Sequence, residues 1–104
     1  MEKGVIALKA KSDKASLKTM AYQVSQLTTR AVKTNIEIVD CIITFGGVKD
    51  VLREVKKLDA QKRFDSLLIY SPNQICKDET EYLAFEKILA EDYKIQIRFV
   101  RNNF

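Results

Sequence analysis

Hydrophobic residues recur along the chain in seven segments whose spacing alternates between that of strands and that of helices. Four segments are rich in β-branched residues or alternate with polar ones, which predicts strands at 3–10, 35–44, 64–71 and 93–102. The three segments between them carry apolar residues at three- and four-residue steps, which predicts amphipathic helices. These helices are expected to begin after a cap at Ser16, after Gly46-Gly47, and after caps at Asp78 to Thr80.

The order β-α-β-α-β-α-β predicts a single α/β domain of three layers, with a mostly parallel four-stranded sheet covered by helices on both faces. The segment at 64–71 has almost no polar relief, as expected of a strand that is buried on both faces. In such sheets the functional site lies at the carboxyl ends of the strands. Those ends fall near Ser12, at 44–49 and at 71–77, so three separate segments are expected to meet at one rim.

The composition limits the classes of protein to which the chain can belong. With 104 residues, 46% hydrophobic and 31% charged, the chain has the balance of one ordinary globular domain. No apolar run approaches the roughly 20 residues of a membrane helix, and the first residues lack a signal-peptide layout, so the expected location is cytoplasmic, without a membrane partner. Histidine is absent and Cys41 and Cys76 form no CxxC pattern, so we expect neither a metal nor a cofactor. Cys41 lies in an apolar run and is interpreted as a buried, reduced thiol.

The charge permits a nucleic-acid partner without requiring one. The formal net charge is +4, from 18 basic and 14 acidic residues, and most of the basic residues are lysines. Two nucleotide-binding classes are excluded by motif: the first strand is not followed by GxGxxG, and GxxxxGK[ST] does not occur. A receiver domain is also disfavoured, because "KAKSD" and "LIYS" do not supply its acidic cluster and strand-end aspartate.

Four segments at the predicted rim resemble one family, the N-terminal catalytic domain of resolvase/invertase-type serine recombinases. They are "LKAKS" (8–12), "SLKTMAYQVSQL" (16–27), "FGGVKDVL" (45–52) and "FDSLLIYSPNQICKD" (64–78). The family pattern has Tyr-x-Arg-x-Ser after the first strand, a Ser-Leu…Gln…Leu helix, a Ser-Gly loop with an arginine, and Leu-Asp-Arg-Leu-x-Arg after the third strand. The similarity covers essentially the whole chain and implies a resolvase-like fold over residues 1–104.

The resemblance also implies a chemistry, in which a serine attacks a DNA phosphodiester and forms a phosphoserine link. By this similarity Ser12 stands at the nucleophile position and Gln23 at that of a glutamine that assists the site. Arginines in such a site bind phosphate oxygens bidentately and stabilise the charge of the transition state. The arginine expected two residues before the serine is Ala10 here, a lost charge.

The other charged residues of the family pattern are also replaced in this sequence. The arginine ahead of the second helix corresponds to Lys49. In the loop after the third strand, the family aspartate corresponds to Asn73, its first arginine to Gln74 and its second to Lys77. Lysine neutralises a phosphate as a point charge but lacks the planar fork, so we expect a degenerate site that is defective in strand cleavage.

Three functions stay open. The first is a recombinase-like remnant or regulatory module that is linked to DNA recombination or a mobile element, binds DNA weakly and without sequence specificity, and pairs with an active recombinase. The second is a residual recombinase that uses Ser12. The third is a protein-interaction domain unrelated to recombination. Active family members continue into a long dimerisation helix and a DNA-reading domain, whereas this sequence stops at "RFVRNNF", so sequence-specific binding by this domain alone is not expected. Cys76 in the rim loop would be reactive if a neighbouring lysine lowered its pKa.

Overall fold

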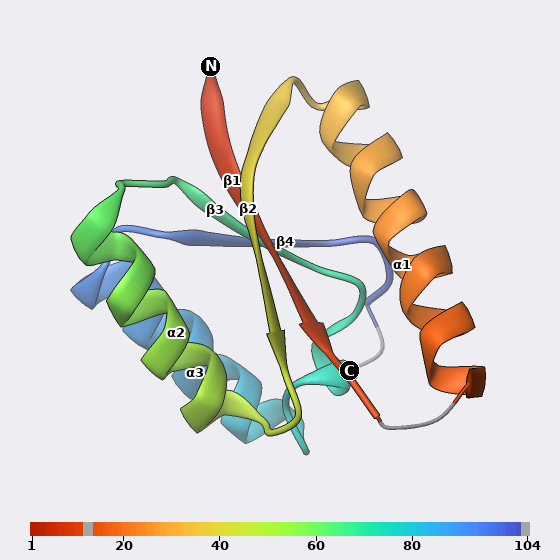
Figure 1. Cartoon of the computed structure of the whole chain (residues 1–104). Coiled ribbons are helices and arrows are strands. Elements are labelled where there is room, and N and C mark those ends of the chain that lie inside the picture. Colours follow the sequence, from red (N-terminus) through yellow and green to blue (C-terminus); the bar gives the residue numbers. More distant parts are fainter. Residues whose placement is uncertain (12–13, 103–104) are drawn as a thin grey trace.

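The predicted order of strands and helices is confirmed by a computed structural model, which describes residues 1–11 and 14–102 (Figure 1). The elements are β1 (Glu2–Lys9), α1 (Lys14–Lys33), β2 (Ile36–Thr44), α2 (Val48–Gln61), β3 (Ser66–Ile69), α3 (Glu79–Asp92) and β4 (Gln96–Phe99). A short 3₁₀ turn, η1 (Pro72–Gln74), follows β3.

The four strands form one sheet in the order β2-β1-β3-β4, and every neighbouring pair is parallel. Figure 1 shows α1 alone on one side of the sheet and α2 and α3 together on the other. This arrangement confirms the predicted three-layer α/β domain. Because the strands are parallel, their carboxyl ends lie at the same end of the sheet, where η1 also lies.

Two apolar clusters hold the layers together, one on each face of the sheet. On the α1 face, Leu27 and Ala31 pack against Ile6, Leu8 and Leu68. On the other face a larger cluster joins the sheet to α2 and α3 through Val51, Val55, Phe85, Leu89, Leu67 and Ile69. All four residues of β3 are buried, as its apolar sequence predicts, and burying each large side chain contributes about 1.5–3 kcal/mol.

The first helix differs in two ways from its prediction. It begins at Lys14, so Ser16 lies inside the first turn, where its Oγ accepts a hydrogen bond from the backbone N–H of Lys11 at 3.1 Å. The helical spacing of apolar residues in the sequence places Leu17 and Val32 on the predicted apolar face, but they are 62% and 75% exposed. The buried stripe is narrower than the run of apolar residues and consists of Met20, Val24, Leu27 and Ala31.

An irregularity in β2 overturns the interpretation of Cys41 as a buried thiol. Gly4 and Val5 of β1 pair with Ile38 and Asp40, so Val39 is an extra residue in β2. A single extra residue moves the following side chains to the opposite face of a sheet. Cys41 consequently lies opposite Ile6 on the α1 face of an edge strand, where it is exposed.

Among the described residues, no helix combines the length and the apolar composition needed to span a bilayer.

Candidate functional site

A cleft opens at the carboxyl end of the sheet, between the end of β1, the first half of α1 and η1. Its volume is about 540 Å³. Its lining residues come from these three segments: Lys9, Lys11, Ser16, Thr19, Met20, Gln23, Asn73 and Gln74. The cleft therefore lies where the topology places functional sites in parallel α/β sheets.

Lys9 and Lys11 form the cationic side of the cleft. Ala10 lies between these two lysines in the sequence and is only 8% exposed. Its backbone N–H donates a hydrogen bond to the carbonyl of Thr44 at 2.8 Å. This bond fixes the chain at the end of β1, next to the end of β2. Neither Lys9 nor Lys11 makes an ion pair with another described residue.

One face of α1 forms a wall of the cleft. Thr19 and Met20 lie three and four residues after Ser16 and four and three residues before Gln23, so the four side chains share one side of the helix. The Oε1 atom of Gln23 accepts a hydrogen bond of 2.6 Å from Nε2 of Gln74. The Oε1 atom of Gln74 is buried and has no hydrogen-bond partner among the described residues. The amide pair joins α1 to the loop after β3.

The loop after β3 is shaped by the only proline in the sequence. Pro72 occupies the first position of η1, and its carbonyl accepts from the backbone N–H of Cys76 at 3.0 Å. The Ser71 hydroxyl donates a hydrogen bond to Oδ1 of Asn73. The tight turn presents Asn73 and Gln74 to the cleft.

Only some of the site residues that the sequence predicts lie at the cleft. Gln23, Asn73 and Gln74 come together at the cleft, and Ala10 lies buried beside it. Ser12 lies outside the described residues. Lys77 is exposed and is not among the residues that line the cleft.

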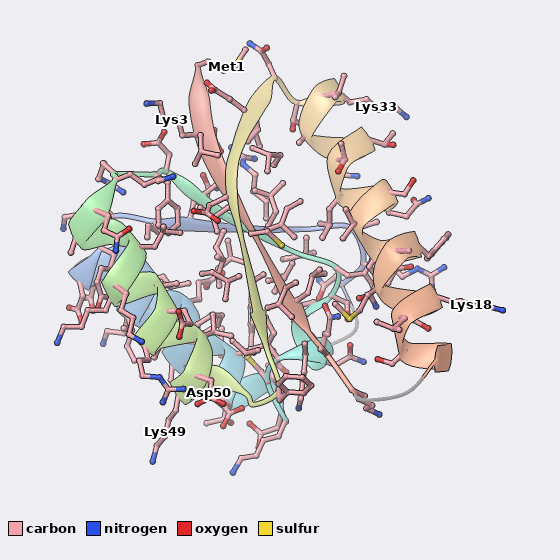
Figure 2. The ribbon with its side chains drawn as sticks, viewed as in Figure 1. Met1, Lys3, Lys18, Lys33, Lys49 and Asp50 are labelled. Atoms are coloured by element: carbon pink, nitrogen blue, oxygen red, sulfur yellow. The ribbon has the colours of Figure 1, made fainter. Side chains whose placement is uncertain are left out.

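Lys49 is also exposed and does not line the cleft. Figure 2 shows Lys49 and Asp50 at the start of α2, on the side of the sheet opposite α1, with Lys49 pointing away from the domain. Its assignment to phosphate binding stays a prediction, as does that of Lys77.

Sequence reasoning missed Lys9 and Lys11. A signal was present, because two lysines flank an alanine at the end of an apolar strand that points to the expected rim. The similarity to the recombinase pattern concerns the position between them, Ala10, where it implies an arginine.

Three arginines that could have supplied a positive charge to the cleft lie elsewhere or pair with other residues. Arg53 pairs with Asp50 at 2.8 Å on α2. Arg98 makes a bidentate ion pair with Glu2, with Nε–Oε2 and Nη2–Oε1 distances of 2.7 and 2.9 Å. Arg30 lines a different pocket. Of the described residues that line the cleft, none is an arginine.

Cys76 does not have the environment of a reactive thiol. It is buried, and burial raises its pKa to about 11, with the Glu81 and Asp78 carboxylates adding to the increase. No lysine lowers its pKa, so the suggestion of a reactive rim cysteine is wrong. Within the described residues, no group of three or more histidine, cysteine, aspartate or glutamate side chains is placed to hold a metal ion.

The fold is that of the catalytic domains of serine recombinases of the resolvase type. Two solved structures are similar to nearly the whole chain. A resolvase family site-specific recombinase from Streptococcus pneumoniae matches with a TM-score of 0.79 and 16% sequence identity, over 96% of this chain and 72% of that chain. The C-terminal catalytic domain of ISC1926 TnpA, an IS607-like serine recombinase, matches with a TM-score of 0.74 and 16% identity, over 95% of this chain and 70% of that chain.

No protein-family model and no curated protein matches the sequence. The two structures are so distant in sequence that they show the fold alone.

Proposed function

We propose that this serine recombinase-like domain binds a DNA phosphodiester backbone in the cleft and does not cleave it. The observation that carries the proposal is the pair of lysines, Lys9 and Lys11, which face the cleft without ion-pair partners among the described residues. Their ammonium groups attract phosphate oxygens as point charges. The amide groups of Gln23 and Asn73 supply further polar contacts to a bound strand.

The proposed lack of cleavage is supported by the absence of arginines from the described residues that line the cleft. A phosphoryl transition state gains most from preorganised donors in a fixed geometry, and removing one such donor typically costs about 10²–10³ in rate. Ala10 and Gln74 are uncharged where the similarity to recombinases implies arginine, and the Gln74 amide is already bonded to Gln23. Two such losses would lower the rate by at least about 10⁴ if their effects were independent.

A domain that holds DNA without cutting it would serve as an accessory or regulatory module beside an active recombinase, for example one encoded by a mobile element. The competing function is a residual strand-exchange enzyme in which Ser12 attacks the phosphate and Lys49 and Lys77 assist. The two functions differ in whether a covalent protein–DNA link forms.

Binding is tested by fluorescence anisotropy with a labelled DNA duplex over a series of salt concentrations. The expected result is salt-dependent binding in which Lys9→Ala and Lys11→Ala each reduce the slope of log K against log salt by about 0.9. Lys87→Ala is the matched control, because Lys87 is exposed on α3 and lies away from the cleft. Absence of binding at low salt, or equal losses in all three variants, would refute the proposed function.

A further inference from the structure

A second surface lies along the side of α1 that faces β4. Tyr22, Gln26 and Arg30 follow one another at four-residue steps and form a row along the helix. At one end of the row, the Tyr22 ring contacts Tyr70 edge to face, with centroids 6.2 Å apart. At the other end, Arg30 and Arg98 line a common pocket of about 230 Å³.

The backbone N–H of Arg101 donates to the carbonyl of Tyr70 at 2.9 Å, which brings the chain after β4 beside the same aromatic pair. Figure 1 shows this segment turning back close to α1. The surface, called the α1–β4 groove below, comprises Tyr22, Gln26, Arg30, Tyr70, Arg98 and Arg101.

The α1–β4 groove is positively charged. Arg98 is neutralised by Glu2, whereas Arg30 and Arg101 make no ion pair with a described residue. The sequence of α1, residues 14–33, contains three lysines and one arginine but no aspartate or glutamate. Figure 2 shows Lys18 and Lys33 pointing outwards near the two ends of this helix. The charge therefore complements a polyanion that runs along α1.

An aromatic platform lies within this charged surface. Tyr22 is 54% exposed although its ring contacts that of Tyr70, so part of the side chain is open to a planar group. Nucleobases stack on exposed aromatic rings, and guanidinium groups bind the phosphates between them. Base pairing and base stacking cover the faces of the bases in a duplex, so only an unpaired strand can use such a platform.

We propose that the α1–β4 groove binds single-stranded nucleic acid, with a base stacked on Tyr22 and phosphates held by Arg30 and Arg101. This inference rests on the proposed function, because the strand would pass from the cleft to the groove. Tyr22 is next to the cleft residue Gln23 in the sequence, and Tyr70 precedes the loop that carries Asn73. From Tyr22 to Arg30 the helix rises about 12 Å. The groove thus provides a track for a strand that leaves the cleft unpaired.

The test compares the affinities of a labelled single-stranded oligonucleotide and of the same sequence as a duplex. Tyr22→Ala is expected to weaken single-strand binding at least about five-fold, whereas Tyr22→Phe keeps the ring and the affinity. Leu83→Ala is the control, because Leu83 is 53% exposed and lies on α3. Arg30→Ala should lower the single-strand salt slope by about 0.7, and Arg53→Ala, with the same loss of charge, should leave it unchanged.

The inference is overturned if Tyr22→Ala binds the single strand like the unaltered protein, or if Tyr22→Phe loses as much affinity as Tyr22→Ala. In that case, duplex binding that still depends on Lys9 and Lys11 would leave the proposed function intact. Conversely, single-strand binding that responds to Tyr22 and Arg30, together with duplex binding that does not respond to Lys9 or Lys11, would support the α1–β4 groove and refute the proposed role of the cleft.

Discussion

The Nε2 atom of Gln74 donates a hydrogen bond of 2.6 Å to Oε1 of Gln23, and so joins the loop after β3 to α1 across 51 positions of the sequence. The similarity to recombinases implies an arginine at the position of Gln74. Here the side chain at that position closes the wall of the cleft through a neutral contact. Lys9 and Lys11 are the cations among the described residues that line the cleft, so they would provide its positive charge.

Disrupting this amide pair should destabilise the domain. Gln23→Ala leaves the Gln74 amide without its acceptor, and the free energy of unfolding should fall by about 1–2 kcal/mol. The double variant Gln23→Ala/Gln74→Ala should lose less than the sum of the single losses, with a coupling of about 0.5–1.5 kcal/mol. Urea unfolding monitored by circular dichroism measures these differences. Gln61→Ala at the exposed end of α2 is the control, and additive losses would show that the two amides do not interact.

The Glu2–Arg98 ion pair predicts a stability difference that depends on pH. The Arg98 guanidinium and then the Ser66 hydroxyl lower the pKa of the Glu2 carboxyl. A carboxyl with a lowered pKa stabilises the fold above its unfolded pKa, and this contribution is lost as the pH falls through the folded pKa. Glu2→Gln should therefore reduce the free energy of unfolding by about 0.5–1 kcal/mol near neutral pH, and the difference should shrink as the pH falls through the lowered pKa of Glu2 in the folded state. A difference that persists unchanged in acid would contradict this assignment; Glu37→Gln is the control.

The two cysteines should differ in their rates of alkylation. Cys41 is exposed on the edge strand, whereas Cys76 is buried and its pKa is raised to about 11. At about pH 8 only about one in a thousand Cys76 side chains would be thiolate. Iodoacetamide should therefore modify Cys41 first, and the Cys41→Ser variant should react only after unfolding. Mass spectrometry of timed samples measures both rates, and rapid labelling of Cys76 in the folded Cys41→Ser variant would disprove the burial argument.

Removing the Asp78 side chain, which caps the N-terminus of α3, should destabilise the domain. Its side chain accepts a hydrogen bond of 2.8 Å from the backbone N–H of Glu81 at the start of the helix. Asp78→Ala should lower the free energy of unfolding by about 1 kcal/mol, and Asp78→Ser should restore most of it. Thermal and urea unfolding provide the measurement. Asp92→Ala at the other end of α3 is the control, and an equal loss there would argue against a capping effect.

The sequence predicts the architecture well because its apolar spacing is strong. Leu27, Val55 and Phe85 fall on predicted helix faces and are buried in the structure. The prediction failed where a tertiary feature decides the outcome. The extra residue Val39 turns Cys41 to the exposed side of β2, and no local pattern distinguishes this irregular strand from a regular one.

The candidate site could be predicted only in part. The rim position follows from parallel topology, and the similarity to recombinases identified Gln23, Asn73 and Gln74, which do lie together. The hydrogen bond between Gln23 and Gln74 joins residues far apart in the sequence and cannot be read from either segment. Lys9 and Lys11 resemble ordinary solvated lysines until the position of the cleft is known.

The central claim is that the cleft binds DNA without cutting it, and a search for a covalent adduct tests it most directly. The protein is incubated with supercoiled DNA that carries candidate sites, and protein–DNA adducts are separated on a denaturing gel beside an active serine recombinase as positive control. The account predicts salt-dependent binding and no adduct. An adduct that forms with the unaltered protein and disappears in Ser12→Ala would contradict it.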